Sequence, residues 1–194
     1  MAWIKQFDEE QALQCAMEQF WAHGYEATSM QDLVDRMGIN RGSLYHTFGD
    51  KRSLFIRAFQ SYVQQYREQV LSKLEQHPSP RQAIHSLFQG LIDLSATEQG
   101  RRGCFMTNTA LELAAHDPEI GALVKKRLQG LEAFFKQLIV RAQALGEIAK
   151  DHDPDALAAH LLSVQLGIRV LMRAWPEGRV LQGIVDAALA SLDR

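Results

Sequence analysis

The stretch 28–54, TSMQDLVDRMGINRGSLYHTFGDKRSL, most constrains how this chain of 194 residues can fold. Its first apolar residues recur three, four and seven positions apart, which marks one face of a helix: Met30, Leu33, Val34 and Met37. Gly38 follows at the position where a left-handed residue commonly ends a helix. Leu44 and Phe48, four residues apart, predict a second helix from about residue 41. Two short helices joined by a tight turn that contains glycine form a helix-turn-helix.

The outward side of the second helix, 41–47, predicts contact with duplex DNA. It carries donors and acceptors and no acid, which suits a phosphate-lined groove: Arg41, Gly42, Ser43, Tyr45, His46 and Thr47. Arg41 can fork onto guanine O6 and N7, Gly42 lets the backbone approach closely, and Ser43 can bond a base edge. We therefore predict that these three residues read bases. A phosphate contact without base reading is the alternative for Arg41.

DNA phosphates are expected at neighbouring helix starts and on the flanks of this helix. The helix over 30–37 begins with a capping box, either Thr28 with Gln31 or Ser29 with Asp32, and its free N–H groups can also bind a phosphate. Lys51 opens the next helix, where a cation is unfavourable for the helix dipole unless an anion opposes it. The predicted phosphate contacts are Thr28, Ser29, Tyr45, His46, Thr47 and Lys51. Ordinary surface or half-buried positions are the alternatives for these side chains.

The net charge of −2 does not itself indicate a nucleic-acid-binding protein. Residues 1–52 hold five Lys or Arg residues against eight Asp or Glu residues. Four of these acids belong to the helix predicted at 8–23, and none lies within 37–48. We therefore give the position of the charges more weight than their sum.

Two segments of the chain resemble the DNA-binding domain of TetR-family transcriptional repressors. They are 24–29, GYEATS, and 38–51, GINRGSLYHTFGDK. The resemblance covers about residues 7–55, and the remainder is similar only in length and helical pattern. It implies an all-α homodimer whose C-terminal domain binds a small-molecule effector that releases DNA. The resulting prediction is a sequence-specific transcriptional regulator that binds double-stranded DNA, acts as a repressor and is not an enzyme.

The whole chain is predicted to be all-α, with about nine helices. Pro is scarce, at 5 residues, while Ala, Leu, Gln and Glu are common. Proline, glycine and capping signals predict helices outside the helix-turn-helix at 8–23, 50–76, 79–97, 104–115, 117–145, 153–172 and 178–192. We predict a DNA-binding domain at 1–52 and a helical effector-binding and dimerisation domain at 53–194.

The last two helices are apolar over a wider arc than a small domain needs to bury internally. We predict that they form a two-fold four-helix bundle with a second copy of the chain. The residues predicted at this interface are Leu161, Val164, Ile168, Leu181, Ile184, Val185, Ala188 and Leu192. An ordinary monomer core is the alternative. Two reading helices one turn of DNA apart would require a near-palindromic operator.

Polar residues on otherwise apolar helices predict a cavity for a medium-sized, partly apolar effector. Asn108 and Glu112 are four residues apart, as are Gln165 and Arg169, so each pair shares a helix face. Pairing of these polar groups with one another is the alternative. The predicted lining is Phe88, Leu91, Cys104, Phe105, Asn108, Glu112, Phe134, Leu138, Gln165, Arg169 and Met172.

Cys104 follows Arg101, Arg102 and Gly103 at a predicted helix start. Cations and a helix N-terminus both lower the pKa of a thiol, which makes it more reactive. An electrophile or oxidant is therefore one effector class that the sequence suggests. An inert cysteine buried at a helix start is the alternative.

Other functional classes have little support in the sequence. The two cysteines lack metal-ligand spacing, and no phosphate loop or nucleophile–base pattern occurs, so we predict no metal, cofactor or catalytic residue. No apolar run approaches about 20 residues and no signal-peptide pattern opens the chain, so we predict no membrane span. The two cysteines, Cys15 and Cys104, favour a reducing cytoplasm as the location. A helical carrier or enzyme without DNA function and a protein-interaction adaptor are the remaining alternatives.

Overall fold

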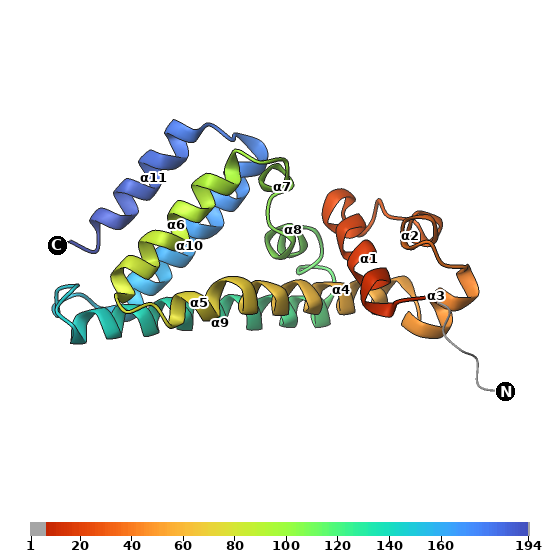
Figure 1. The fold of residues 1–194 in the computed structure, drawn as a ribbon, viewed down its shortest axis with the longest axis horizontal. Helices are drawn as coiled ribbons and strands as arrows, with labels where there is room; N and C mark the ends of the chain where they lie inside the picture. Colours follow the sequence, from red (N-terminus) through yellow and green to blue (C-terminus); the bar gives the residue numbers. More distant parts are fainter. Residues whose placement is uncertain (1–6, 194) are drawn as a thin grey trace.

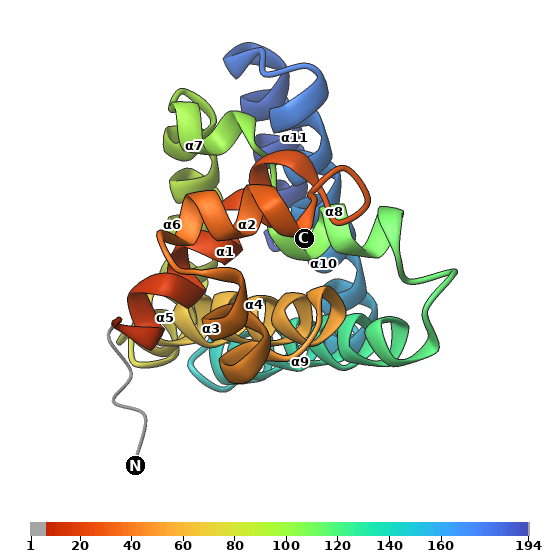
Figure 2. The same cartoon turned by 90° about the vertical axis from the view of Figure 1, so that its right-hand side faces the viewer.

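The computed structural model describes residues 7–193, which contain helices and no strand. The helices are α1 (Glu9–His23), α2 (Met30–Met37), α3 (Arg41–Phe48), α4 (Lys51–Tyr66), the π-helical turn η1 (Arg67–Leu71), α5 (Ser72–Glu75), α6 (Pro80–Ser95), α7 (Glu98–Arg101), α8 (Phe105–Glu112), α9 (Pro118–Ala144), α10 (Pro154–Ala174) and α11 (Gly178–Ala190). The molecule is elongated, with α1–α3 at one end and α11 at the other (Figure 1). In both views α10 and α11 rise above a layer that contains α4 and α9 (Figure 2).

The first three helices form the predicted helix-turn-helix unit. Each begins at a side chain that accepts backbone N–H bonds: Asp8 for α1, Ser29 for α2 and Asn40 for α3. Gly38 ends α2 at φ 65°, in the left-handed conformation that glycine adopts without a steric penalty. The apolar faces meet in a core that contains Phe20, Leu33, Leu44 and Phe48, each 2% exposed or less. This core fixes the orientation of α3.

One continuous helical rod, α4 with η1 and α5, connects this unit to the rest of the chain. The rod from Lys51 to Glu75 is about 38 Å long at 1.5 Å per residue. The sequence predicted a single regular helix here. The structure places a π-helical turn near its C-terminal end, where the Ser72 N–H donates to the Arg67 carbonyl. Such π turns are frequent at functional sites because they redirect the following side chains.

The all-α prediction is confirmed, and each of the nine predicted helices has a counterpart of eight residues or more within residues 7–193. The short α7 is an addition, since the segment 98–103 was expected to be a loop. The proposed boundary between residues 52 and 53 falls inside α4, which packs against α1 and α8. The division into two domains at that residue therefore stays a prediction.

α10 is long and apolar enough to cross a membrane by length and composition alone. A core helix meets the same criterion, so this finding does not overturn the expectation of no membrane span, which stays a prediction. α10 packs against α9, α11, α6 and α8, and it carries the buried polar residues Gln165 and Arg169. These contacts explain its apolar composition as packing within the protein, and they leave one of its faces exposed.

Candidate nucleic-acid interface and cavities

The exposed face of α3 presents a cation, a phenol and an imidazole together. Arg41, Gly42 and His46 are exposed, and Tyr45 is 44% exposed. The Arg41 guanidinium carbon lies 5.8 Å from the centroid of the Tyr45 ring, one helical turn further on. No acid lies on α3. The face can therefore donate hydrogen bonds to an anionic surface such as the edge of a DNA groove.

Two of the predicted DNA contacts are buried. Ser43 is 4% exposed, and its N–H donates to the Asn40 side-chain oxygen at 2.8 Å. Thr28 is fully buried, and its hydroxyl donates to the Gly24 carbonyl at 2.6 Å. Both side chains point into the unit, which corrects their assignment to base reading and phosphate binding. Asn40 is exposed at the start of α3 and was not singled out in the sequence, although its capping position is a recognisable signal.

The remaining predicted phosphate contacts differ in exposure. Ser29 is exposed and forms a capping box with Asp32, which decides between the two caps that the sequence allowed. Thr47 is half-buried, and its carbonyl accepts a bond from Arg57 at 3.0 Å. Lys51 is half-buried, with its Nζ atom 4.3 Å from the centroid of the Tyr25 ring. The aromatic ring holds this ammonium group at the start of α4.

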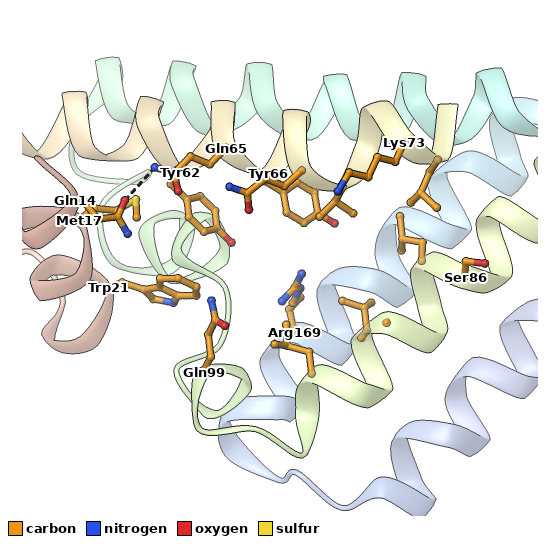
Figure 3. A pocket seen from close by; sticks show the side chains of 17 residues that line it. Gln14, Met17, Trp21, Tyr62, Gln65, Tyr66, Lys73, Ser86, Gln99 and Arg169 are labelled. Atoms are coloured by element: carbon orange, nitrogen blue, oxygen red, sulfur yellow. Dashed lines mark hydrogen bonds between the residues drawn. The ribbon is translucent and has the colours of Figure 1, made fainter. Parts of the chain in front are cut away.

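The larger of two adjoining cavities has a volume of about 430 Å³ and lies between α1, the α4–α5 rod, α6 and α10. Trp21, Gln99 and Arg169 face Tyr62 and Tyr66 across it (Figure 3). Its wall also includes residues around the π turn: Tyr66, Gln69 and Val70. Only Leu91 and Arg169 of the predicted lining are found here.

The smaller cavity, of about 20 Å³, shares Tyr62, Tyr66 and Arg169 with the larger one. Cys104 and Gln165, both predicted, line it together with Arg127 and Thr107. The Tyr62 hydroxyl lies 3.4 Å from the Cys104 sulfur, and Gln165 Nε2 donates to the Tyr66 hydroxyl at 3.2 Å. The sequence did not single out Arg127, which lies on α9 without a motif around it.

Cys104 is buried, at 6% exposure, and occupies the position immediately before α8. Burial acts to raise the pKa of its thiol, but the positive charge of Arg169 and the hydrogen bonds from Tyr62 and Thr107 together lower this pKa below its ordinary value. The predicted cations were Arg101 and Arg102, whereas the structure supplies the charge from Arg169 on α10. Burial and the nearby Cys104 raise the pKa of the Tyr62 hydroxyl well above its ordinary value.

Most of the predicted lining lies elsewhere. Phe88, Phe105, Phe134, Leu138 and Met172 are 3% exposed or less and belong to the hydrophobic core. Asn108 and Glu112 line a separate surface hollow beside Trp21 and Arg173. Their predicted role in an effector cavity is corrected accordingly. Helix periodicity identified these residues as inward-facing, but it cannot tell packed core from cavity wall.

Two contacts join the helix-turn-helix unit to the C-terminal helices, and a third joins α4 to the start of α9. The Glu112 carboxylate accepts the backbone N–H groups of Tyr25 and Glu26 at 3.1 and 2.9 Å. The Trp21 indole N–H donates to the Gly103 carbonyl at 3.2 Å. Arg52 forks onto Asp117 with bonds of 2.7 and 2.9 Å and also reaches Glu119. The end of α8 and the segment just before α8 therefore contact the unit directly, whereas the start of α9 contacts α4.

The predicted dimer residues face mainly into their own chain. Within the single protomer, six of the eight are 2% exposed or less: Leu161, Ile168, Leu181, Val185, Ala188 and Leu192. Val164 and Ile184 are half-buried. The buried six form protomer core and cannot contact a second copy as placed, which corrects their assignment. The opposite face of α10 is exposed at Ala159, Ser163, Gly167 and Val170.

No group of three or more possible metal ligands occurs within residues 7–193.

Two family models match the chain. Residues 12–58 match the bacterial regulatory proteins of the tetR family, and residues 80–188 match the tetracyclin repressor-like C-terminal domain. The chain belongs to the TetR family. A TetR-family chain of this kind is a DNA-binding transcriptional regulator, and the family's members are regulators and not enzymes. The exposed face of α3 lies within the residues matched by the first of these models.

Relatives match this TetR-family chain along nearly its whole length. The uncharacterised regulator YezE of Bacillus subtilis is 35% identical over 97% of this chain and 98% of its own, and the repressor ComR of Escherichia coli is 31% identical over 97% and 89%. A cysteine-substituted CifR bound to 26-base-pair double-strand operator DNA is 28% identical, covers 97% of this chain and 98% of its own, and has a TM-score of 0.84.

Proposed function

We propose that this TetR-family regulator is a homodimeric repressor that a small-molecule effector releases from a near-palindromic operator. The observation that carries the proposal is the position of the larger cavity. Its walls come from α1 of the DNA-binding unit as well as from the α4–α5 rod, α6 and α10. A ligand that fills this cavity touches both parts of the molecule at once, and it can bias their relative orientation. The cytoplasm, in contact with the nucleoid, is the location that this activity requires.

On DNA, Arg41 is the proposed base-reading side chain, and Gly42 allows the backbone of α3 to come close to the groove. Ser29, Tyr45, His46 and Lys51 are the proposed phosphate contacts, with Thr47 at the edge of the contact because it is half-buried. The cation–π contacts hold Arg41 and Lys51 near aromatic rings before DNA arrives. That arrangement reduces the side-chain freedom lost on binding.

The signal is proposed to travel through α1 and α8. Trp21 lines the cavity and bonds Gly103, and Glu112 at the other end of α8 holds the backbone between α1 and α2. A ligand that pushes Trp21 or the rod therefore moves the anchoring points of the reading helix. Release follows because two reading helices bind together only when their spacing matches one turn of DNA.

The proposed dimer uses the exposed faces of α10 and α11 and not their buried faces. Small residues lie along this side of α10 at Ala159, Ser163 and Gly167, followed by Val170, which is 42% exposed. On α11, Gly183 and Ala187 are exposed. Small side chains permit close helix approach in a four-helix bundle, and pairing this face with its symmetry mate would cover the exposed side of α10.

An electrophile or oxidant is one effector class that the lowered pKa of Cys104 favours. A thiolate at this position would form a carbon–sulfur bond to the β-carbon of an α,β-unsaturated carbonyl compound, while the α-carbon takes a proton from water. Tyr62 lies within hydrogen-bond distance of the sulfur and on the wall of the larger cavity, so the adduct would form beside the proposed effector space.

An equilibrium binding assay with the DNA upstream of the chain's own gene tests the proposal. The wild type should bind this DNA as a dimer, with an affinity that falls steeply with salt concentration. Arg41→Ala should weaken binding by roughly 1–3 kcal/mol and relax the preference at one base position. Equal affinity of wild type and Arg41→Ala for operator and unrelated DNA would refute sequence-specific reading by α3.

A further inference from the structure

We infer that the small cavity between Arg127, Arg169, Tyr66 and Gln165 is a recognition site for the carboxylate of the effector. The inference rests on the proposed effector function and names its ligand chemistry: a monocarboxylate whose apolar chain or ring occupies the larger cavity.

The guanidinium groups of Arg127 and Arg169 both lie at the small cavity, and neither has a carboxylate partner among the described residues. The guanidinium carbons of Arg127 and Arg169 lie 5.5 and 5.9 Å from the centroid of the same Tyr66 ring. Arg169 is 7% exposed and Arg127 is half-buried. No carboxylate in the described part of the chain forms an ion pair with either one. Buried charges in proteins are normally paired, because leaving the solvent without a counter-ion is costly.

The Cys104 thiol, which ionises more readily than the two tyrosine hydroxyls, does not balance the charge of the site. With Cys104 as a thiol, the cluster carries two positive charges. With Cys104 as a thiolate beside Arg169, it still carries one. Burial lowers the pKa of the Arg127 guanidinium, although that group remains charged at neutral pH. A second anion is therefore needed to neutralise this part of the interior.

Hydrogen-bonding groups around the cavity also lack partners. Among the described residues, Arg127 Nη2 and Gln165 Oε1 are buried without a hydrogen-bond partner. Gln165 is 3% exposed. Turning the Gln165 amide over would let its oxygen accept from the Tyr66 hydroxyl and aim its N–H groups at the cavity. The convergent donors then suit the oxygens of a carboxylate, which a guanidinium fork binds in two parallel bonds.

The sizes of the two cavities favour an effector with a small anionic group attached to a larger apolar part. The small cavity, of about 20 Å³, has room for a group of the size of a water molecule or a carboxylate oxygen. It shares Tyr62, Tyr66 and Arg169 with the cavity of about 430 Å³, whose wall includes Met17, Trp21, Leu87 and Leu91. A carboxylate at the arginines would therefore place its hydrocarbon part against these apolar side chains.

The test compares acids with neutral amides of the same shape on the full chain. Binding of octanoate, octanamide, benzoate and benzamide is measured by calorimetry and by the melting temperature, with inorganic phosphate as a further anion. We expect at least one acid to bind at least tenfold more tightly than its amide. Arg169→Met and Arg127→Met should each abolish that preference. Arg173→Met, an exposed arginine one turn along α10, should retain it.

The ligand-free melting temperatures give a second readout. Because Arg169 lacks an acidic partner, Arg169→Met should melt no lower than wild type, whereas a structural arginine would lower the melting temperature when removed. A lower melting temperature for Arg169→Met, equal binding of acids and amides, or stabilisation by phosphate alone would each overturn the inference.

Binding of upstream DNA is measured separately on the same proteins. If wild type binds DNA but shows no acid preference, the carboxylate inference fails and the proposed regulator stands. If the acid preference depends on Arg169 and octanoate or benzoate does not change DNA binding, the carboxylate site stands and effector-controlled release fails.

Discussion

At the scale of single residues, the position of a cation matters more to this protein than the total charge. The net charge is −2, yet the exposed face of α3 carries Arg41 and no acid. Lys51 is held over the Tyr25 ring at a helix start, where the helix dipole opposes a cation. A DNA phosphate bound near the start of α4 would offset the unfavourable interaction between the Lys51 ammonium group and the helix dipole.

Lys51→Met should weaken DNA binding by a similar factor for every sequence, because a phosphate contact carries no base information. The log–log slope of affinity against salt should become shallower by about 0.9, the value for one neutralised phosphate. Fluorescence anisotropy at several salt concentrations measures both quantities. Lys150→Met, in the loop after α9, is the matched control and should leave both unchanged. A changed base preference for Lys51→Met would contradict the phosphate role.

Cys104→Ser should abolish the release of DNA by an α,β-unsaturated carbonyl compound while leaving DNA affinity itself within about twofold. Serine keeps a hydrogen-bonding group beside Tyr62, but it lacks the nucleophilic thiolate. The measurement is DNA binding after treatment with N-ethylmaleimide, with mass spectrometry to locate the adduct. Cys15→Ser, a half-buried cysteine on α1, serves as control. A Cys104→Ser protein that still releases DNA on treatment would rule out this effector class.

At the scale of helices, capping residues in the sequence predicted where helices begin, whereas the cavities depend on contacts between helices that are distant in sequence. Capping residues such as Asp117 and Asp153 gave the starts of α9 and α10 correctly, because a cap acts within its own turn. The π turn at Arg67–Leu71 has no comparable local signal. The walls of the cavities could not be predicted either, since Trp21, Tyr66 and Arg169 lie far apart in sequence and meet only after packing.

The ion pair between α4 and the start of α9 should make stability depend on pH. The side-chain hydrogen bond from Arg52, helped by the Ile120 N–H, lowers the pKa of Asp117 from 3.8 to about 2. A carboxyl group with a lowered folded-state pKa contributes stability above about pH 4, and it loses that contribution as the pH falls to about 2. The difference in urea midpoint between wild type and Asp117→Asn should therefore shrink over that interval.

Urea unfolding at pH 6, 4, 3 and 2.5 gives this comparison, and Asn keeps a side-chain oxygen that can cap α9. Asp151→Asn, in the exposed loop before α10, is the control and should show no such convergence. A midpoint difference between wild type and Asp117→Asn that is constant from pH 6 to 2.5 would mean that the carboxylate charge of Asp117 contributes nothing to the fold.

At the scale of the whole molecule, one face of α10 packs inside its own chain, and the opposite face is the proposed dimer surface. Its buried face, with Leu161 and Ile168, completes the core of one chain. Helical periodicity identified that face readily and led to its wrong assignment to the dimer, because hydrophobic spacing does not say whether the partner helix is in the same chain. The exposed face is built from small residues that a search for large apolar side chains passes over.

Gly167→Glu should therefore convert the proposed dimer to a monomer. No atom lies within 4 Å of a Cβ added at Gly167, so the protomer itself accommodates the side chain, and glutamate is a better helix former than glycine. In a bundle of close-packed helices, however, the two symmetry-related carboxylates would meet across the axis and repel each other. Light scattering at micromolar concentration measures the mass, and the same samples report operator affinity.

Gly130→Glu on α9 is the matched control, since Gly130 is also exposed on a helix and also has no atom within 4 Å of an added Cβ. It should leave the dimer and its operator affinity intact. A Gly167→Glu protein that stays dimeric would place the symmetry axis on another face. One that becomes a monomer with wild-type operator affinity would show that a single helix-turn-helix suffices, because joint binding of two half-sites is what links the dimer to recognition.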